Sequence, residues 1–358
     1  MKPAPPLWGR PAKFLEHSLR PGRRIGWFVL FAALFAAQVV PRIFQDSAYL
    51  DEAWETTSGY YYWLRGDAAP PYNHPPLANA LQALPLVFLH LKVDPNVWQE
   101  GENRAYSLYY VSNPGRLGTI LEAPRFLMLG FALAFGFLLY RVVLREKGAV
   151  FLAALFLWAF DPTLLSFSIV SKADMPFSFF CFAGLLLFRR GQVERSWKWD
   201  ALAGALAGAA VTSKMTALCL PVLYGGWDLW EAWKRPAFRG ALVRRWAVGS
   251  AACAGVVFLV YFPGTLRLAD HRWPFAYFLS RVREALGTGG ELGTVCGFLG
   301  GFYPRAEWWQ VPVMFVLKSP LPFLALLALG GTLWARGKVR LPDWAWIFPI
   351  GWTALLCV

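Results

Sequence analysis

Charged side chains stand beside apolar runs in this sequence, and the first such group is a pair of adjacent acids. Asp51 and Glu52 follow an apolar run that ends near residue 43. A carboxylate there suits a general base, or a ligand for a cationic or hydroxyl-rich substrate. Acids at membrane depth usually mark a pathway or a catalytic site, although two solvated loop carboxylates would give the same pattern. Position alone leaves both interpretations open.

The same polar segment ends in a histidine followed by two prolines. It reads Y-N-H-P-P from Tyr72 to Pro76, and Tyr72 and His74 are candidates for substrate binding. The prolines fix the backbone and disfavour helix before them, so we expect His74 on a rigid, extended turn. From there His74 could donate a hydrogen bond to a phosphate or to Asp51. The alternative is that the prolines only begin a helix and that His74 packs against it.

A second acidic position lies in a short polar connection between two apolar runs. Asp174 is the only acid there, and it precedes Met175 and Pro176. Two carboxylates on separate loops of one membrane face could share a cavity, where their neighbours would give them different roles. The alternative is a helix N-cap, because Asp before Pro is a normal helix start. Capping and catalysis are compatible, so both stay open.

Three basic residues near these acids could stabilise a phosphate. Lys214 lies between two apolar stretches, Arg125 begins another run, and Lys172 shares the short connection with Asp174. A cation at the outer interface can bind a lipid phosphate and stabilise a phosphate leaving group as an anion. For Lys214 and Arg125 the alternative is snorkelling of the side chain toward the headgroups.

The composition indicates a helical membrane protein. Of the 358 residues 57% are hydrophobic and 16% are charged, against about 25% charged in a typical soluble domain. This excludes a disordered protein, a disulfide-stapled secreted domain and an ordinary cytosolic enzyme. The net charge of +13 comes from Lys and Arg between apolar runs, which is typical of topology signals, so we predict no nucleic-acid partner. Five Cys without CxxC spacing, and no metal-ligand cluster, predict neither structural zinc nor a cofactor, and leave metal dependence open.

Apolar runs of roughly membrane length predict an all-α polytopic fold with about eight or nine spans. They lie at 25–43, 124–140, 149–169, 175–188, 201–213, 215–230, 246–263 and 311–334, and a ninth begins near 343. A further run, 77–91, contains a proline between polar segments, and we expect an interfacial or re-entrant helix. The pattern G-A-L-A-G from Gly204 to Gly208 predicts close helix packing.

The distribution of Lys and Arg predicts the orientation of these spans. A cytoplasmic N-terminal segment, 1–24, makes every inside loop short and basic and places most of the 35 Lys and Arg inside. The polar stretches 44–123 and 264–310 then face outward, with the transmembrane domain extending over 25–358. No ATP or nucleotide sugar is available on that face, so an activated substrate must arrive attached to a lipid.

In this order the motifs resemble the superfamily of protein O-mannosyltransferases and aminoarabinose transferases, which is glycosyltransferase family 39-like. Its members are lipid-carrier-dependent glycosyltransferases with the GT-C fold. The resemblance runs from about residue 49 to 325 and rests on D-E at 51–52, H-P-P-L at 74–77, K-A-D-M at 172–175, T-S-K at 212–214, G-F-Y at 301–303, W-W at 308–309 and L-K-S-P-L-P at 317–322.

This resemblance implies roles for the residues that match. Asp51 would be the base for the acceptor, Glu52 would support it, and Asp174 would line the same cavity. Lys214 and Arg125 would lie near the lipid phosphate. At position 74 the aminoarabinose branch has Lys, whereas this chain has His74, as the mannosyltransferase branch does. Because relatives continue with more helices, we expect that the chain is truncated at its C-terminus.

These inferences predict an integral-membrane glycosyltransferase in the plasma membrane of a bacterium. It would move a sugar from a polyprenyl phosphate to a protein, lipid or glycan acceptor on the periplasmic, extracytoplasmic face, with inversion at C1. Two alternatives stay open. One is a transporter or binding protein for a lipid-linked sugar, which predicts functional acids and bases deep within spans. The other is an inactive fragment of such an enzyme.

Overall fold

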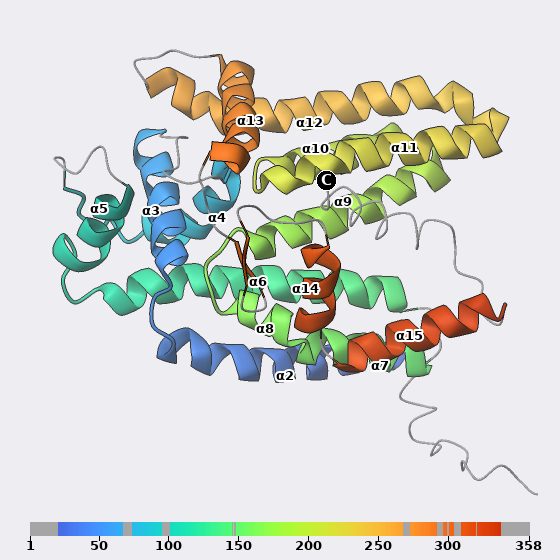
Figure 1. The fold of residues 1–358 in the computed structure, drawn as a ribbon, viewed down its shortest axis with the longest axis horizontal. Coiled ribbons are helices and arrows are strands. Elements are labelled where there is room, and N and C mark those ends of the chain that lie inside the picture. The colour runs from blue at the N-terminus through green and yellow to red at the C-terminus, as the bar shows by residue number, and fades with distance from the viewer. Residues whose placement is uncertain are drawn as a thin grey trace, which may run out of the picture.

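Helices make up nearly all of the described chain (Figure 1). The computed structural model describes residues 21–66, 74–94, 101–144, 146, 148–267, 273–291, 296–298, 301–303, 309–319 and 321–337. The all-α prediction holds with one exception, an antiparallel pair of three-residue strands, β1 (Cys296–Phe298) and β2 (Gly301–Tyr303).

Three described helices are long and apolar enough to cross a membrane. They are α2 (Arg24–Gln45), α6 (Leu117–Val143) and α12 (Arg239–Arg267). Helices α7 (Gly148–Phe160) and α8 (Pro162–Ser168) make a fourth candidate if counted together, although they meet at a bend of 48°. The bend lies at Asp161, which caps α8 by accepting a hydrogen bond from the Leu164 amide at 2.8 Å. The chain is therefore a membrane protein with three or four candidate spans.

The remaining predicted runs also form helices, but these are shorter or more polar than one span requires. They are α9 (Asp174–Glu194), α10 (Trp197–Val211), α11 (Cys219–Lys234), α14 (Gln310–Lys318) and α15 (Leu321–Ala335). The run predicted at 311–334 is thus divided near Ser319. The run from 343 and most of the basic N-terminal segment fall outside the described residues. A total of eight or nine spans stays a prediction.

The polar stretch predicted at 44–123 contains more helix than the sequence indicated. It holds α3 (Leu50–Arg65), α4 (Pro76–Val87), α5 (Gly101–Tyr106) and a short π-helical turn (Ser107–Val111). The acids in the first turn of α3 favour its N-terminus, and Gly66 ends it with a left-handed φ of 69°. Helix α4 begins at Pro76, the second of two prolines, so the run predicted at 77–91 is helical as far as Val87. Its interfacial or re-entrant position stays a prediction. Helix α13 (Pro274–Glu291) follows α12.

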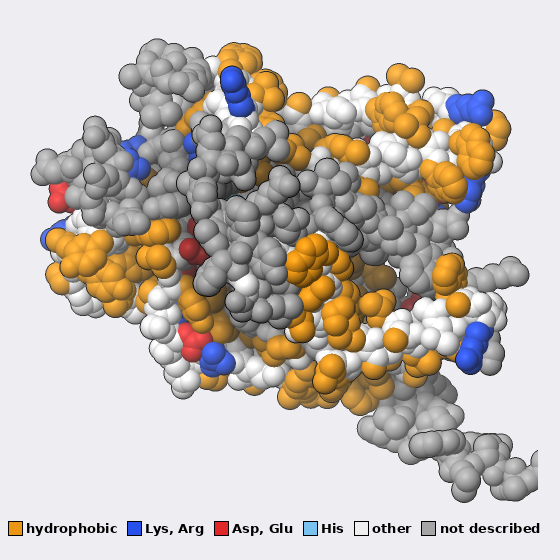
Figure 2. Space-filling view, in the orientation of Figure 1, with side chains coloured by type: hydrophobic (Ala, Val, Ile, Leu, Met, Phe, Trp, Pro, Cys, Tyr) orange, Lys and Arg blue, Asp and Glu red, His pale blue; other side chains and the backbone are white. Residues whose placement is uncertain are grey.

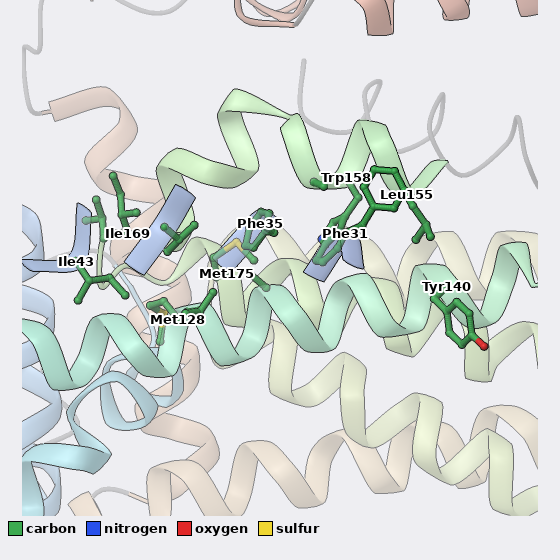
Figure 3. Packing of buried hydrophobic residues seen from close by; sticks show 14 of the residues in the cluster. Phe31, Phe35, Ile43, Met128, Tyr140, Leu155, Trp158, Ile169 and Met175 are labelled. Atoms are coloured by element: carbon green, nitrogen blue, oxygen red, sulfur yellow. The ribbon is translucent and has the colours of Figure 1, made fainter. Parts of the chain in front are cut away.

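The helices are arranged in two groups joined by α9. In Figure 1, α2 and α6 run along one side, α10, α11 and α12 run along the other, and α3 to α5 gather at one end. Phe35, Met128, Leu155 and Trp158 are at most 2% exposed in the core between α2, α6 and α7 (Figure 3). Apolar side chains also cover much of the outer surface (Figure 2), as a membrane protein requires.

Close packing of α10 on α12 confirms the prediction made from the small-residue pattern. A Cβ added at Gly204 would lie 2.1 Å from the Gly249 carbonyl oxygen, and one at Gly208 would lie 2.7 Å from that of Cys253. Both contacts are with backbone, so only glycine permits this separation of the two helices.

Candidate functional site

The two adjacent acids at the start of α3 lie in different environments. The Asp51 side chain is 56% exposed, and its Oδ2 is 2.6 Å from Nζ of Lys172. The Glu52 side chain is 1% exposed. Successive helical residues point about 100° apart, so one acid faces the surface and the other faces the protein interior. Asp51 is consequently the acid of this pair that a substrate can reach.

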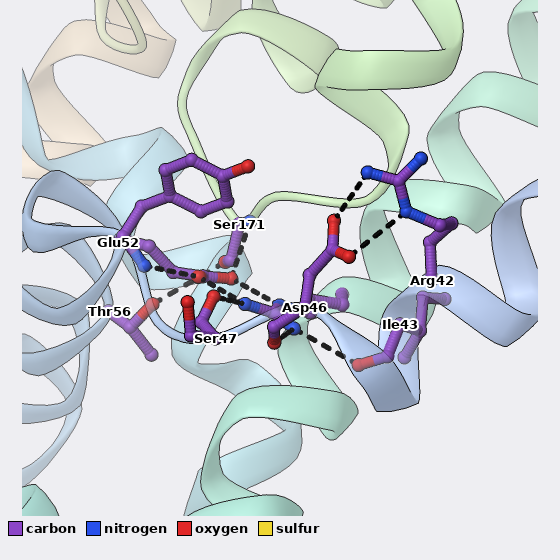
Figure 4. A network of polar contacts seen from close by, with 9 residues as sticks. Arg42, Ile43, Asp46, Ser47, Glu52, Thr56 and Ser171 are labelled. Atoms are coloured by element: carbon purple, nitrogen blue, oxygen red, sulfur yellow. Dashed lines mark hydrogen bonds and ion pairs between the residues drawn. The ribbon is translucent and has the colours of Figure 1, made fainter.

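Glu52 forms a buried, bidentate ion pair with Arg125 of α6. Nε and Nη2 of Arg125 each lie 2.8 Å from a carboxylate oxygen of Glu52. The other N–H groups donate to the carbonyls of Ile43, Asp46 and Ser47 at 2.7 to 3.0 Å (Figure 4). All five N–H donors of Arg125 are thus used by the protein. This arrangement ties the end of α2 to α3 and α6. The guanidinium of Arg125, which was predicted to contact a phosphate, is thus bound entirely by groups of the protein.

Two carboxylates of α3 hold the short connection before α9. Glu52 Oε1 accepts from the Ser171 amide at 2.9 Å, and Glu55 Oε2 accepts from the Ala173 amide at 2.9 Å. Both Ser171 and Ala173 are at most 1% exposed. The residue between these two amides is Lys172, and Asp174 follows them. The buried acids therefore fix the backbone from which two predicted site residues extend.

Asp174 and Lys214 form the second ion pair of the site. Oδ1 and Nζ are 2.7 Å apart, and each side chain is 25% exposed. Lys214 follows the C-terminus of α10, where the Thr212 carbonyl accepts from the Leu77 amide at 2.9 Å. This backbone bond brings the first turn of α4, and with it His74, to the end of α10.

His74 lies within electrostatic range of both ion pairs. Burial lowers the pKa of its imidazole, and the positive charge of Lys214 lowers it further. Asp174 and Asp51 act in the opposite direction, and Lys172 adds to the lowering. The net direction is downward, so His74 is a neutral imidazole at pH 7 with one donor and one acceptor nitrogen. A neutral imidazole can hydrogen-bond a phosphate oxygen or an acceptor hydroxyl without adding charge.

The charges on Lys172 and Asp51 support each other. Burial lowers the pKa of Lys172, but the hydrogen bond and charge of Asp51, together with the charges of Glu55 and Asp174, outweigh it, so the net shift is upward. Lys172 therefore stays protonated over the whole physiological range. Any anion that reaches this surface meets two ammonium groups, those of Lys172 and Lys214. Each ammonium group is paired with a partly exposed carboxylate, which the anion can displace.

The structure brings seven of the eight predicted site residues to one end of the helical assembly. Three acids, two lysines, one histidine and one arginine meet there: Asp51, Glu52, Asp174, Lys172, Lys214, His74 and Arg125. Tyr72 lies outside the described residues. Within the described part of the chain, no group of three His, Cys, Asp or Glu side chains could hold a metal ion.

The sequence analysis missed Glu55, a buried member of the same site. It is 6% exposed and also accepts a hydrogen bond from Nε2 of Gln82 in α4 at 3.0 Å. The signal was its spacing, because residues three apart lie on neighbouring parts of one helix face. Glu52 and Glu55 have this spacing, but the segment was interpreted as a polar loop, so helical periodicity was not applied to it.

Comparison with protein-family models gives no match, and comparison with curated protein sequences gives none either. The functional interpretation therefore rests on the residues and their geometry.

Proposed function

We propose that the protein transfers a sugar from a polyprenyl phosphate to an acceptor at the membrane surface. The observation that carries this proposal is the pair of lysine–carboxylate contacts, Lys172 with Asp51 and Lys214 with Asp174, beside a neutral His74. Each pair contains a cation for a phosphate and a carboxylate for a proton. The resemblance to lipid-carrier-dependent glycosyltransferases of the GT-C fold supports the same assignment.

The chemistry requires a positive environment for the leaving group and a base for the nucleophile. As the bond between C1 and the phosphate oxygen breaks, its electron pair leaves on the polyprenyl phosphate, next to Lys172 and Lys214. The acceptor oxygen or nitrogen forms the new bond to C1 and loses its proton to Asp51. A phosphate that draws Lys172 away would free Asp51 for this role. One displacement from the opposite face predicts inversion at C1.

The orientation is part of the proposal. The positive-inside pattern of the loops supports an active site on the extracytoplasmic face of a bacterial plasma membrane. The donor would arrive from the bilayer, and the acceptor, whether protein, lipid or glycan, would approach Asp51 from the aqueous side.

Donor turnover in proteoliposomes tests this function. The full chain is supplied with a panel of polyprenyl-phosphate sugars and a mixed acceptor extract, and the lipids are followed by mass spectrometry. We expect acceptor-dependent loss of one donor in the wild type and at least a hundredfold slower loss in Asp51→Asn. Asp46→Asn is the matched control, because that carboxylate pairs with Arg42 outside the site. Equal rates in both variants would remove Asp51 as the base.

Transport of a lipid-linked sugar is a second candidate, which one specific observation favours. Arg245 of α12 forms ion pairs with Asp200 of α10 and Asp228 of α11, and all three side chains are at most 3% exposed. Buried ionisable groups between the helices of a membrane protein can mark a transport pathway, and these three lie near the ends of the apolar runs. Under this alternative, labelled donor would cross the vesicle membrane without being consumed, and Asp51→Asn would leave that rate unchanged.

A further inference from the structure

Glu55 is a buried carboxylate that the proposed reaction does not use. It lies on α3, four residues after Asp51 and three after Glu52. Its Oε2 accepts two hydrogen bonds, from the Ala173 amide at 2.9 Å and from Nε2 of Gln82 at 3.0 Å. Burying a carboxylate costs free energy unless hydrogen bonds compensate its charge. These bonds reach α4 on one side and the connection between α8 and α9 on the other.

The two acids of α3 match the backbone of that connection in spacing. Glu52 binds the Ser171 amide, and Glu55 binds the Ala173 amide. Residues three apart on a helix lie about 5 Å apart on one face, and the Ser171 and Ala173 amides flank Lys172, whose own amide donates to the Val170 carbonyl at 3.0 Å. Two amides on one side of the connection can therefore meet two carboxylates on one face of α3. Lys172, between the two amides, extends toward Asp51.

We propose that Glu55 is a positioning residue, which anchors the Ala173 amide so that Lys172 and Asp174 stay in register with Asp51 and Lys214. This proposal rests on the proposed glycosyl transfer for its purpose, but not for its geometry. Without the anchor at Ala173, the backbone of Asp174 is free to shift relative to Lys214. Both lysine–carboxylate pairs would then lose the geometry that a phosphate and an acceptor require.

Protonation of Glu55 would weaken this anchor. Burial raises the pKa of Glu55 to about 7, although the bonds from Gln82 and Ala173 oppose the shift. The charged groups that face it from the connection are Lys172, which lowers this pKa, and Asp174, which raises it. From α4 it meets the neutral Gln82, and the nearby Glu52 is already paired with Arg125 of α6. Below about pH 7 the charge-assisted bond to the Ala173 amide becomes a weaker neutral one.

Amide hydrogen exchange of the full chain in lipid nanodiscs tests the anchor without an activity assay. At pH 8 we expect Glu55→Gln to raise the exchange rate of residues 171–174 about tenfold, since one charge-assisted hydrogen bond becomes a neutral one. At pH 6 the difference from the wild type should narrow. Thr57→Val is the matched control, because Thr57 is buried in α3 and its hydroxyl has no hydrogen-bond partner among the described residues. Unchanged exchange in a folded Glu55→Gln protein would overturn the proposal.

Steady-state kinetics with the donor identified above separates positioning from simple support of the fold. We expect Glu55→Gln to lower kcat at least tenfold with a smaller change in KM. The wild type should lose activity below about pH 7, where Glu55 is protonated, and the variant should lack this pH dependence. Glu55→Asp keeps the charge and should keep part of the activity, which covers the case in which the amide variant does not fold. Faster exchange with wild-type kcat would overturn the positioning role. If the wild type consumes no donor, glycosyl transfer fails, and the exchange result alone decides the anchor.

Discussion

At the scale of single residues, the site separates buried groups that hold the structure from partly exposed groups that a ligand can reach. Glu52 and Arg125 are buried and fully engaged with each other and with backbone carbonyls. Asp51, Asp174, Lys172 and Lys214 are partly exposed and bind one another. Exposed pairs contribute little to stability, so these four residues can exchange partners at small cost. The buried pair cannot.

Replacement of Arg125 tests the buried pair. Lysine keeps the charge but has three donors in place of five and cannot bind Glu52 in a bidentate way. We expect Arg125→Lys to lower the free energy of unfolding by about 3 kcal/mol, because it leaves buried carbonyls unpaired and Glu52 incompletely compensated. Melting in detergent measures this loss. The control is Arg116→Lys, whose exposed side chain makes one hydrogen bond to the Leu89 carbonyl. Equal melting temperatures in both variants would contradict a structural role for Arg125.

The pH dependence of stability tests the environment of Glu55. Its pKa is raised by burial from 4.5 to about 7, so the native chain binds a proton more tightly than the unfolded chain. The stability from this group is fully present below about pH 4.5 and is lost as the pH rises through about 7, to a limit of about 3 kcal/mol.

Melting of the wild type against Glu55→Gln measures this contribution. We expect the wild type to lose stability relative to the variant between pH 5 and pH 8, whereas Thr57→Val keeps a constant difference from the wild type. A constant difference for Glu55→Gln as well would show that Glu55 titrates at its ordinary pKa. The ionised form that anchors Ala173 is therefore also the form that costs the fold stability, which is a common condition at functional sites.

At the scale of elements, the position of the site depends on how closely α10 approaches α12. Lys214 lies three residues after the end of α10, so any displacement of this helix also moves the ion pair with Asp174. Gly204→Ala would place a Cβ 2.1 Å from the Gly249 carbonyl oxygen. The helices would have to separate, and we expect a loss of about 1 to 3 kcal/mol.

Gly226→Ala provides the matched control for this change. It lies in α11, and a Cβ there meets nothing within 4 Å. Because alanine favours helix over glycine, this variant should be neutral or more stable by up to about 1 kcal/mol. If Gly204→Ala melted at the same temperature as Gly226→Ala, α10 and α12 would not be held at this distance.

The sequence predicted individual helices better than the contacts between them. Apolar runs of roughly membrane length identified α2, α6 and α12, and two prolines identified the start of α4. Helix α3 was missed because its apolar residues are interspersed with acids and threonines that also face inward, such as Glu55 and Thr56. Polar residues on a buried face remove the contrast on which amphipathic patterns depend. The pairs of Asp51 with Lys172 and of Asp174 with Lys214 join segments 121 and 40 residues apart, and no local pattern specifies such contacts.

At the scale of the whole molecule, α10 separates two groups of charged residues. It has 15 residues, which at 1.5 Å per residue span about 22 Å. Lys214 follows one end, and Asp200, which binds Arg245, lies in the first turn at the other. The lysine–carboxylate pairs and the buried network of Arg245 therefore occupy opposite ends of this helix. If α10 crosses the membrane and the end with Lys214 faces outward, the short basic connection before α10 faces the cytoplasm.

Cysteine labelling in intact cells tests this orientation. In a background without the five native Cys, Arg116→Cys marks the end of the molecule that carries the site, since Arg116 precedes α6 and contacts the end of α4. Lys198→Cys marks the first turn of α10. Both positions are exposed. A membrane-impermeant maleimide should label residue 116 in intact cells and residue 198 only after permeabilisation, because basic loops are retained inside. The reverse pattern would place the lysine–carboxylate pairs in the cytoplasm, where nucleotide sugars are available and the argument for a lipid-linked donor no longer holds.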